Sequence, residues 1–229
     1  MPTLSKAVIL LSPFLLLVSV PGMAQRLKVE DAYRVGDYEL VKGTHYEELS
    51  TPIPTNVGPD KIEVTDVFWY GCPQCFAFEP MIGYWGNLAK GDLVFSRSPI
   101  VWNDITETHA RIYYTAEALK IGNEIHEAAY SAIHEKGNPL RSEEQIRALF
   151  KLQGVTEEKF AQTWNSPSVS SAVEMARDRT ENYELEKVPS VIVNGRYRVT
   201  LNEDVPTFRD MIIVVNLLIK KIRDVRRPD

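Results

Sequence analysis

Residues 62–75 read Ile-Glu-Val-Thr-Asp-Val-Phe-Trp-Tyr-Gly-Cys-Pro-Gln-Cys, and this stretch decides the fold. Its first nine residues, 62–70, are rich in β-branched and aromatic side chains, which predicts a buried β-strand. Gly71 interrupts the strand, and a helix is predicted from residue 72 to about residue 90. A second strand is predicted at residues 93–98. The order strand, helix, strand is that of a βαβ unit, and both cysteines lie where its first strand meets its helix.

The rest of the chain adds helices and a hairpin to this unit. From Thr106 to about Asn182 the pattern is helical throughout, with aromatic and aliphatic stripes typical of core packing. Ser190–Val193 and Arg196–Thr200 are predicted strands, and Asn194-Gly195 between them is typical of a tight hairpin turn. A last helix is predicted from about Val205 to Ile222. The predicted order is therefore βαβ, a helical block, then ββα.

The first residues differ from the rest of the chain. Ala7 to Val20 is almost wholly apolar, Lys6 is the only charge before Arg26, and Gly22-Met23-Ala24 offers the small residues that a signal peptidase reads. This pattern predicts a secretory signal peptide over residues 1–24. The alternative is an uncleaved anchor, although the apolar stretch is short for a membrane span.

Composition narrows the possible functions. The chain has 229 residues and a formal net charge of −5, and no basic stripe stands out, so nucleic-acid binding has no electrostatic basis. The basic residues in 220–227 are interpreted as a solvated helix end. Residues 25–60 are polar and become rich in proline, with a possible edge strand at Tyr38–Lys42.

The number and spacing of the cysteines indicate a reactive role and not a structural one. There are two cysteines, three residues apart, in a chain predicted to reach an oxidising compartment. A disulfide across so short a loop adds little stability, so the pair suits exchange better than stapling. At a helix start, unpaired N–H groups and the helix dipole stabilise a thiolate on Cys72, whereas Cys75 is shielded one turn inside. Cys72 is therefore the predicted partner of substrates, and Cys75 resolves or re-forms the internal disulfide.

Two other interpretations of the pair remain open. Half of a zinc site would need further ligands, but there is no second cysteine pair and the histidines, His45, His109, His126 and His134, are scattered. We therefore predict no metal, and interpret the histidines as surface or packing residues. The pair could also be structurally inert.

Four segments resemble a single known family. They are Val64-Thr65-Asp66-Val67-Phe68-Trp69-Tyr70, Cys72-Pro73-Gln74-Cys75 followed by Phe76 and Phe78-Glu79, Ala161-Gln162-Thr163-Trp164-Asn165-Ser166, and Lys187-Val188-Pro189-Ser190-Val191-Ile192-Val193-Asn194-Gly195-Arg196-Tyr197. The sequence resembles the thioredoxin-fold periplasmic disulfide oxidases of the DsbA type over nearly all of its mature length. The resemblance implies an α/β fold: a thioredoxin-like central sheet with flanking helices, formed by residues 25–105 and 183–229, and an inserted helical domain at 106–182.

The resemblance also implies a site around the cysteines. It makes Val188-Pro189 a cis bond that faces the disulfide, with Pro73 and Gln74 as further substrate contacts. Without it, Pro189 would be a simple edge proline. Asp66 matches the family's buried acid beneath the disulfide, where a raised pKa would let it accept the proton of Cys75. The alternative for Asp66 is an exposed or hydrogen-bonded position at a strand edge.

The expected function is that of a periplasmic dithiol oxidase with no cofactor beyond its Cys72–Cys75 disulfide. Its expected clients are folding exported proteins with cysteines, its expected partner is a membrane reoxidase linked to quinone, and the protein is expected to be a monomer. The family's best-studied members carry histidine where this chain has Gln74, which predicts a less oxidising disulfide and leaves a reductase or isomerase open. A non-catalytic holdase that uses the surface around Trp69, Tyr70 and Pro189 is the third hypothesis.

Overall fold

The computed structural model describes residues 32–36 and 38–227. The predicted signal peptide, residues 1–24, lies outside the described residues. The core is a five-stranded sheet with the strand order β3-β7-β6-β4-β5. Its strands are β3 (Glu47–Glu48), β4 (Ile62–Phe68), β5 (Leu93–Pro99), β6 (Ser190–Val193) and β7 (Tyr197–Thr200). β5 is parallel to β4, while β6 pairs with β4 in the antiparallel sense.

Strand β4 is buried along its whole length because both faces of the sheet are covered. Alternate side chains of a strand point to opposite faces. Ile62 and Val64 pack in a core with helices α1 (Pro73–Leu88) and α7 (Phe208–Arg226), and Val67 packs on the other side against Ile100 and Tyr183. This double burial accounts for the large apolar side chains of β4, although Glu63, Thr65 and Asp66 of the same strand are buried as well.

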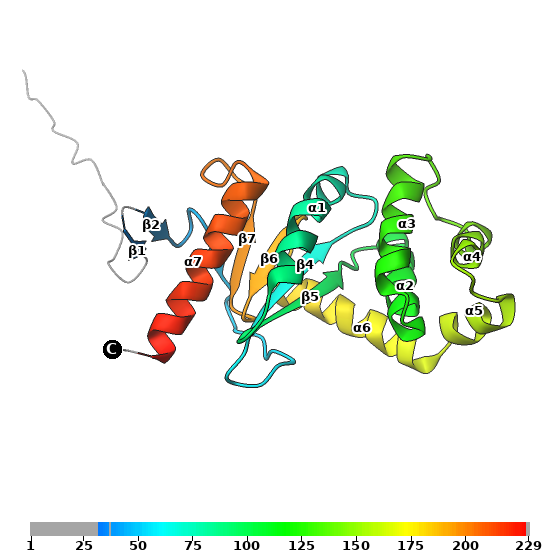
Figure 1. Cartoon of the computed structure of the whole chain (residues 1–229), viewed down its shortest axis with the longest axis horizontal. Coiled ribbons are helices and arrows are strands. Elements are labelled where there is room, and N and C mark those ends of the chain that lie inside the picture. The colour runs from blue at the N-terminus through cyan, green and yellow to red at the C-terminus, as the bar shows by residue number, and fades with distance from the viewer. Residues whose placement is uncertain (1–31, 37, 228–229) are drawn as a thin grey trace, which may run out of the picture.

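Five helices stand between β5 and β6 in the sequence. They gather at one end of the molecule, beyond β5 and opposite α7, and α6 runs back toward the sheet (Figure 1). Their bounds are α2 (Asp104–Leu119), α3 (Gly122–His134), α4 (Glu143–Leu152), α5 (Glu157–Trp164) and α6 (Pro167–Asn182). Whether residues 106–182 form a separate domain, as the sequence predicts, is a question of independent folding and stays a prediction.

Helix ends differ from the predicted ones where capping residues determine them. α2 begins two residues earlier than predicted, because Asn103 caps it in a reciprocal capping box with Thr106. α7 begins at Phe208 instead of Val205, because Thr207 and Asp210 form the same kind of box. It also runs on to Arg226, beyond the predicted end at Ile222.

A two-stranded hairpin of β1 (Ala32–Val35) and β2 (Tyr38–Val41) precedes the sheet.

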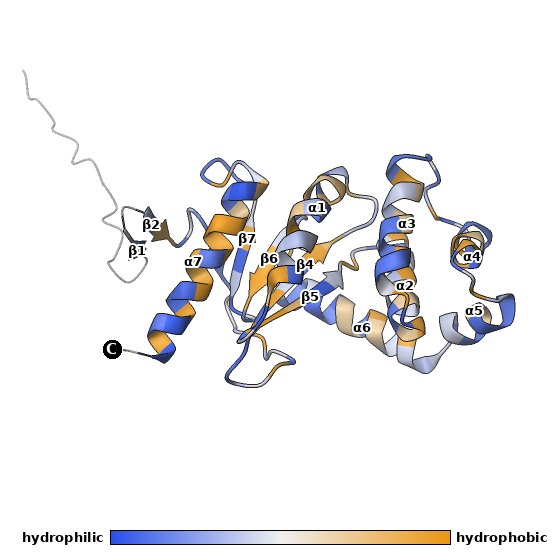
Figure 2. Ribbon diagram, viewed as in Figure 1, coloured by the Kyte–Doolittle hydropathy of each residue, from blue (hydrophilic) through white to orange (hydrophobic). Residues whose placement is uncertain are grey.

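Figure 2 shows hydrophobic colour concentrated in the central strands β4 and β6, and alternating with hydrophilic colour along α7, as expected of a helix with one buried face. None of the helices in the described part of the chain is long and apolar enough to cross a membrane.

Candidate active site

The two cysteines lie at the first turn of α1, as the sequence predicts. Cys72 is the N-cap residue in extended conformation, and its Sγ accepts a hydrogen bond from the backbone N–H of Cys75 at 3.3 Å. Pro73 occupies the first turn, where a missing N–H costs no hydrogen bond. Both cysteines are free thiols and both are buried, whereas Pro73 and Gln74 between them are exposed.

The surroundings shift the pKa values of the two thiols in opposite directions. A hydrogen bond from the Cys75 side chain, helped by backbone N–H groups of the helix start and opposed by burial, lowers the pKa of Cys72 to about 6. Burial raises the pKa of Cys75 far above its usual range, and its contact with Cys72 adds to the effect. Cys72 is thus the thiolate of the pair, and Cys75 keeps its proton.

Val188 and Pro189 meet Cys72 because of the sheet topology. β6 runs antiparallel to β4, so the residues just before β6 lie at the end of β4 that leads to the cysteines. The Val188–Pro189 peptide bond is cis, which confirms that prediction. The carbonyl of Val188 lies 3.5 Å from Cys72 Sγ, a sulfur–oxygen contact between residues 116 positions apart.

Asp66 lies in the middle of β4 and is 2% exposed. It points to the same face as Ile62 and Val64, which is the face covered by α1. Burial raises the pKa of Asp66 to about 8, the charge of Glu79 adds to this and that of Arg97 opposes it. Asp66 Oδ1 has no hydrogen-bond partner among the described residues. The alternative of an exposed or hydrogen-bonded position at a strand edge is wrong, because Asp66 is buried in β4, which lies between β6 and β5.

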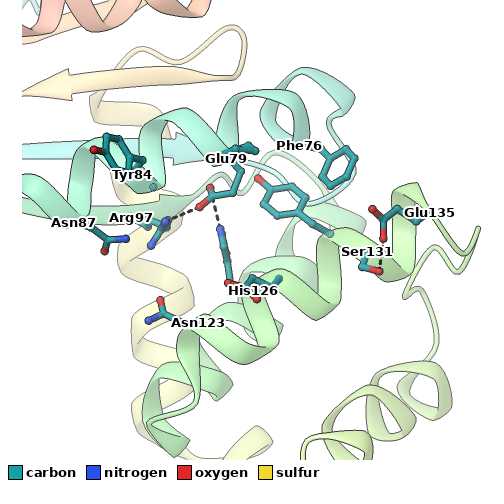
Figure 3. A pocket seen from close by; sticks show the side chains of 13 residues that line it. Phe76, Glu79, Tyr84, Asn87, Arg97, Asn123, His126, Ser131 and Glu135 are labelled. Atoms are coloured by element: carbon teal, nitrogen blue, oxygen red, sulfur yellow. Dashed lines mark hydrogen bonds and ion pairs between the residues drawn. The ribbon is translucent and has the colours of Figure 1, made fainter.

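A cluster of charged side chains beside Asp66 was missed in the sequence. Glu79 lies one helical turn beyond Cys75 on α1 and pairs with Arg97, the cross-strand neighbour of Asp66 on β5, at 2.6 Å. The second oxygen of Glu79 lies 3.1 Å from Nε2 of His126 on α3 (Figure 3). Burial opposes the ionisation of Glu79, but these two contacts outweigh it and lower its pKa.

This cluster borders a cleft of about 510 Å³ between α1 and α3. Glu79, Arg97 and His126 line the cleft together with Phe76 and Tyr130, and Figure 3 shows the side chains of Glu79, Arg97 and His126 pointing toward one another. Neither cysteine lines it. The sequence gives one clue, the four-residue step from Cys75 to Glu79, which places both on one helical face. Nothing local points to Arg97 or His126.

Helix α3 also holds the segment that precedes Cys72. Nε2 of His134 donates to the carbonyl of Tyr70 at 2.7 Å, and the His134 ring stacks on Phe76 with ring centroids 4.7 Å apart. The hydroxyl of Tyr70 meets Nδ1 of His126 at 3.1 Å. Tyr70 is therefore fixed at its backbone and at its side chain by one helix.

The described residues 32–36 and 38–227 contain no cluster of side chains typical of a metal site. No group of three or more His, Cys, Asp or Glu side chains there could hold an ion. The cysteine pair itself offers the chemistry of a thiolate, Cys72, beside a shielded thiol, Cys75. A thioredoxin-like sheet with such a dithiol at the start of α1 defines a thiol:disulfide oxidoreductase.

Known proteins agree with this class. The family model described as a DSBA-like thioredoxin domain matches residues 81–212. The thiol:disulfide interchange protein DsbA of Pseudomonas aeruginosa is 35% identical over 190 residues, which cover 83% of this chain and 85% of that protein. The Azotobacter vinelandii protein of the same name is 35% identical, with 69% and 74% covered.

Solved structures show the same likeness. The crystal structure of Pseudomonas aeruginosa DsbA has a TM-score of 0.76 at 33% identity and covers 81% of this chain and 96% of that one. DsbA from Xylella fastidiosa has a TM-score of 0.72 at 30% identity, with 78% and 95% covered. The chain belongs to the DsbA-like thioredoxin domain family.

Proposed function

We propose that this protein is a dithiol oxidase that introduces disulfide bonds into folding proteins through a Cys72–Cys75 disulfide. A client thiolate attacks Cys72 Sγ, the bond to Cys75 breaks, and its electron pair goes to Cys75 Sγ. Asp66, protonated at neutral pH with a pKa of about 8, supplies the proton that Cys75 takes up. A second client thiolate then attacks the client sulfur, and Cys72 leaves as a thiolate. The client loses two electrons and the enzyme gains them.

The observation that most supports this direction is the low pKa of Cys72. A thiol of low pKa is a good leaving group, so the mixed disulfide releases its client readily. A stabilised thiolate also favours the reduced enzyme, which makes the disulfide a stronger oxidant. The exposed Pro73 and Gln74, and the backbone at Val188 and Pro189, are the surfaces that we assign to client contact.

The setting of the reaction follows from the same proposal. The predicted signal peptide and the likeness to DsbA proteins support a periplasmic location and clients that are exported proteins with cysteines. Two electrons must leave the reduced enzyme after each turnover, and we assign that step to a membrane reoxidase linked to quinone. The disulfide is the only redox group that we propose, and the acting species is a monomer.

A reductase is the second candidate, because Gln74 offers Cys72 no charge. The equilibrium potential of the cysteine pair in glutathione buffers separates the two. A value toward the strong-oxidant end, roughly −120 mV, supports the oxidase, and a value near −270 mV would overturn it. Gln74→His is the matched variant, and it should make the potential more positive because an imidazolium stabilises the Cys72 thiolate.

The holdase hypothesis makes a different prediction for Cys72→Ser. Loss of the nucleophile should abolish oxidative refolding of a reduced client protein in a glutathione-free assay, with activity reduced to background. A holdase would keep its effect on client aggregation and lose nothing in this variant. Oxidative refolding activity retained by Cys72→Ser would therefore exclude exchange chemistry at Cys72.

A further inference from the structure

His126 on α3 is a buried side chain that has no part in the proposed exchange reaction. It is 3% exposed, and both of its ring nitrogens lie close to residues of the active-site region. Nδ1 lies 3.1 Å from the Tyr70 hydroxyl, and Nε2 lies 3.1 Å from the second oxygen of Glu79. Tyr70 precedes the cysteine pair by two residues and Glu79 follows it by four. One imidazole therefore joins the two segments that flank the cysteines.

The two partners of the ring determine which nitrogen of His126 carries the hydrogen. Glu79 pairs with Arg97 at 2.6 Å, so it is a carboxylate and can only accept a hydrogen bond. A carboxylate oxygen 3.1 Å from Nε2 favours a hydrogen on that nitrogen. Burial raises the pKa of Tyr70 well above its usual value, so its hydroxyl keeps its proton and can donate to Nδ1. The Nε2–H tautomer thus suits both partners at once.

Glu79 lies in the same charged cluster as Asp66, whose proton the proposed reaction uses. Arg97, the partner of Glu79, is paired in register with Asp66 across the parallel strands β4 and β5. Residues in register on neighbouring strands point to the same face of a sheet, which here is the face covered by α1. Within this cluster the charge of Glu79 raises the pKa of Asp66 and that of Arg97 lowers it. An ionised Glu79 therefore favours a protonated Asp66.

We propose that His126 is a positioning residue: it holds Glu79 as a carboxylate, and this charge keeps the proton on Asp66. His126 and Arg97 each contact one oxygen of Glu79. A buried carboxylate that loses one of two partners takes up a proton more readily, because burial disfavours its charge. With Glu79 neutral, Arg97 would instead stabilise the carboxylate of Asp66.

The reaction itself is unchanged by this assignment. The proton still passes from the Asp66 carboxyl to Cys75 Sγ, and His126 gives up none. The inference rests on the proposed role of Asp66 as proton donor, but not on the direction of exchange.

The other groups that face this pair of carboxyls keep one charge state between pH 5 and pH 9. Burial opposes the charge of Arg97, but its acidic neighbours outweigh it and raise its pKa. In the dithiol form, burial raises the pKa of Cys75 far above its usual range, and burial also raises the pKa values of the tyrosines. These groups are Arg97 of β5, Cys75 of α1, Tyr113 of α2, Tyr130 of α3, and Tyr70 after β4.

Carboxyl ¹³C NMR of the oxidised protein measures the two titration midpoints separately. Aspartate and glutamate are labelled at the side-chain carboxyl carbon in separate samples, and neither cysteine titrates in the disulfide. His126→Phe keeps an aromatic ring and removes both nitrogens. We expect it to raise the midpoint of Glu79, and to lower that of Asp66 from about 8, each by about one pH unit or more. His126→Gln keeps an N–H that can face Glu79, so both midpoints should stay close to those of the wild type.

His109→Phe is the matched control. His109 is a histidine on α2 that is 2% exposed, and its Nε2 lies 3.2 Å from the carbonyl of Pro139. Its replacement should leave both midpoints unchanged. The proposal is overturned if His126→Phe does not move the midpoints of Glu79 and Asp66, or if His109→Phe moves them as far.

A measurement on the wild type covers the case in which His126→Phe does not fold. ¹⁵N NMR of the histidine-labelled protein distinguishes the two tautomers of a ring. We expect His126 to carry its hydrogen on Nε2, with Nδ1 as the acceptor of the Tyr70 hydroxyl. The Nδ1–H tautomer would place no hydrogen between the ring and Glu79, and would overturn the proposal.

Reduction kinetics separate this inference from the proposed function. The oxidised proteins are mixed with dithiothreitol in a stopped-flow fluorimeter, and the rates of His126→Phe and the wild type are compared at each pH. If Asp66 supplies the proton, the variant should react at close to the wild-type rate at pH 6 and roughly fivefold more slowly at pH 8. Shifted midpoints with the same rate ratio at both pH values would remove Asp66 as proton donor and leave the assignment of His126 standing.

Discussion

The carboxyl of Asp66 links the stability of the protein to pH. Its pKa is raised from 3.8 to about 8, chiefly by burial, so the folded state holds this proton more tightly than the unfolded state. The associated stability is complete below about pH 4 and is lost as the pH rises to 8. We expect the free energy of unfolding of Asp66→Asn, relative to that of the wild type, to increase by a few kcal/mol, on the order of 2–5, as the pH rises from 4 to 8. Urea unfolding at both pH values measures this gain.

Asp92→Asn is the control for this prediction. A hydrogen bond from Arg223 lowers the pKa of Asp92, so its removal should cost stability at neutral pH and nothing at very low pH. The two variants should therefore differ from the wild type with opposite signs of pH dependence. A pH-independent difference for Asp66→Asn would contradict the raised pKa.

Some residues of the site are visible in the sequence and others are not. Cys72 and Cys75 stand out because their spacing and their place at a strand–helix junction are local properties. Arg97 is recognisable only through the strand register that places it beside Asp66, and His126 only through the packing of α3 on α1. Ion pairs between distant segments are products of tertiary structure, and a single sequence does not display them.

At the scale of an element, α3 acts as a support for the segment before Cys72. His134→Leu removes the donor to the Tyr70 carbonyl, and the lost hydrogen bond, worth about 1 kcal/mol, should loosen the peptide that leads to Gly71. Hydrogen exchange measured by mass spectrometry should then be up to about tenfold faster in the peptide covering residues 69–72. His134→Gln keeps a donor and is expected to exchange at close to the wild-type rate. Equal exchange in His134→Leu and the wild type would show that the contact does not restrain this segment.

Elements were predicted where the sequence carries a periodic pattern. β4, β6 and the Asn194-Gly195 hairpin match the prediction because runs of β-branched and aromatic residues and turn residues are local signals. Strand β3 was not predicted, since two residues cannot show a period and it forms only by pairing with β7. Helix ends shifted by a few residues because caps and not the apolar stripe fix them.

At the scale of the whole molecule, the redox state should change the pH dependence of folding. The lowered pKa of Cys72 contributes stability to the reduced protein that is present above the unfolded-state pKa and is lost as the pH falls through about 6. The oxidised protein has no thiolate and lacks this contribution. We expect the difference in Tm, reduced form minus oxidised form, to increase by a few degrees, roughly 2–6 °C, as the pH rises from 5 to 9. Calorimetry of both forms measures the gain, which should vanish when the reduced form carries Cys72→Ser.

Two parts of the site form at different stages of folding, because β4 and β6 are neighbours in the sheet but far apart in the sequence. The cysteine pair and its helix start are made by a dozen consecutive residues, so a chain fragment already carries the means to react with thiols. The Val188 carbonyl reaches Cys72 only after the chain has closed a loop that contains all five helices of the insertion. Reactivity is thus encoded locally, whereas the client surface that we propose at Val188 depends on the finished molecule. A partly folded chain would exchange with any accessible thiol, and only the complete fold adds the surface that we propose selects clients.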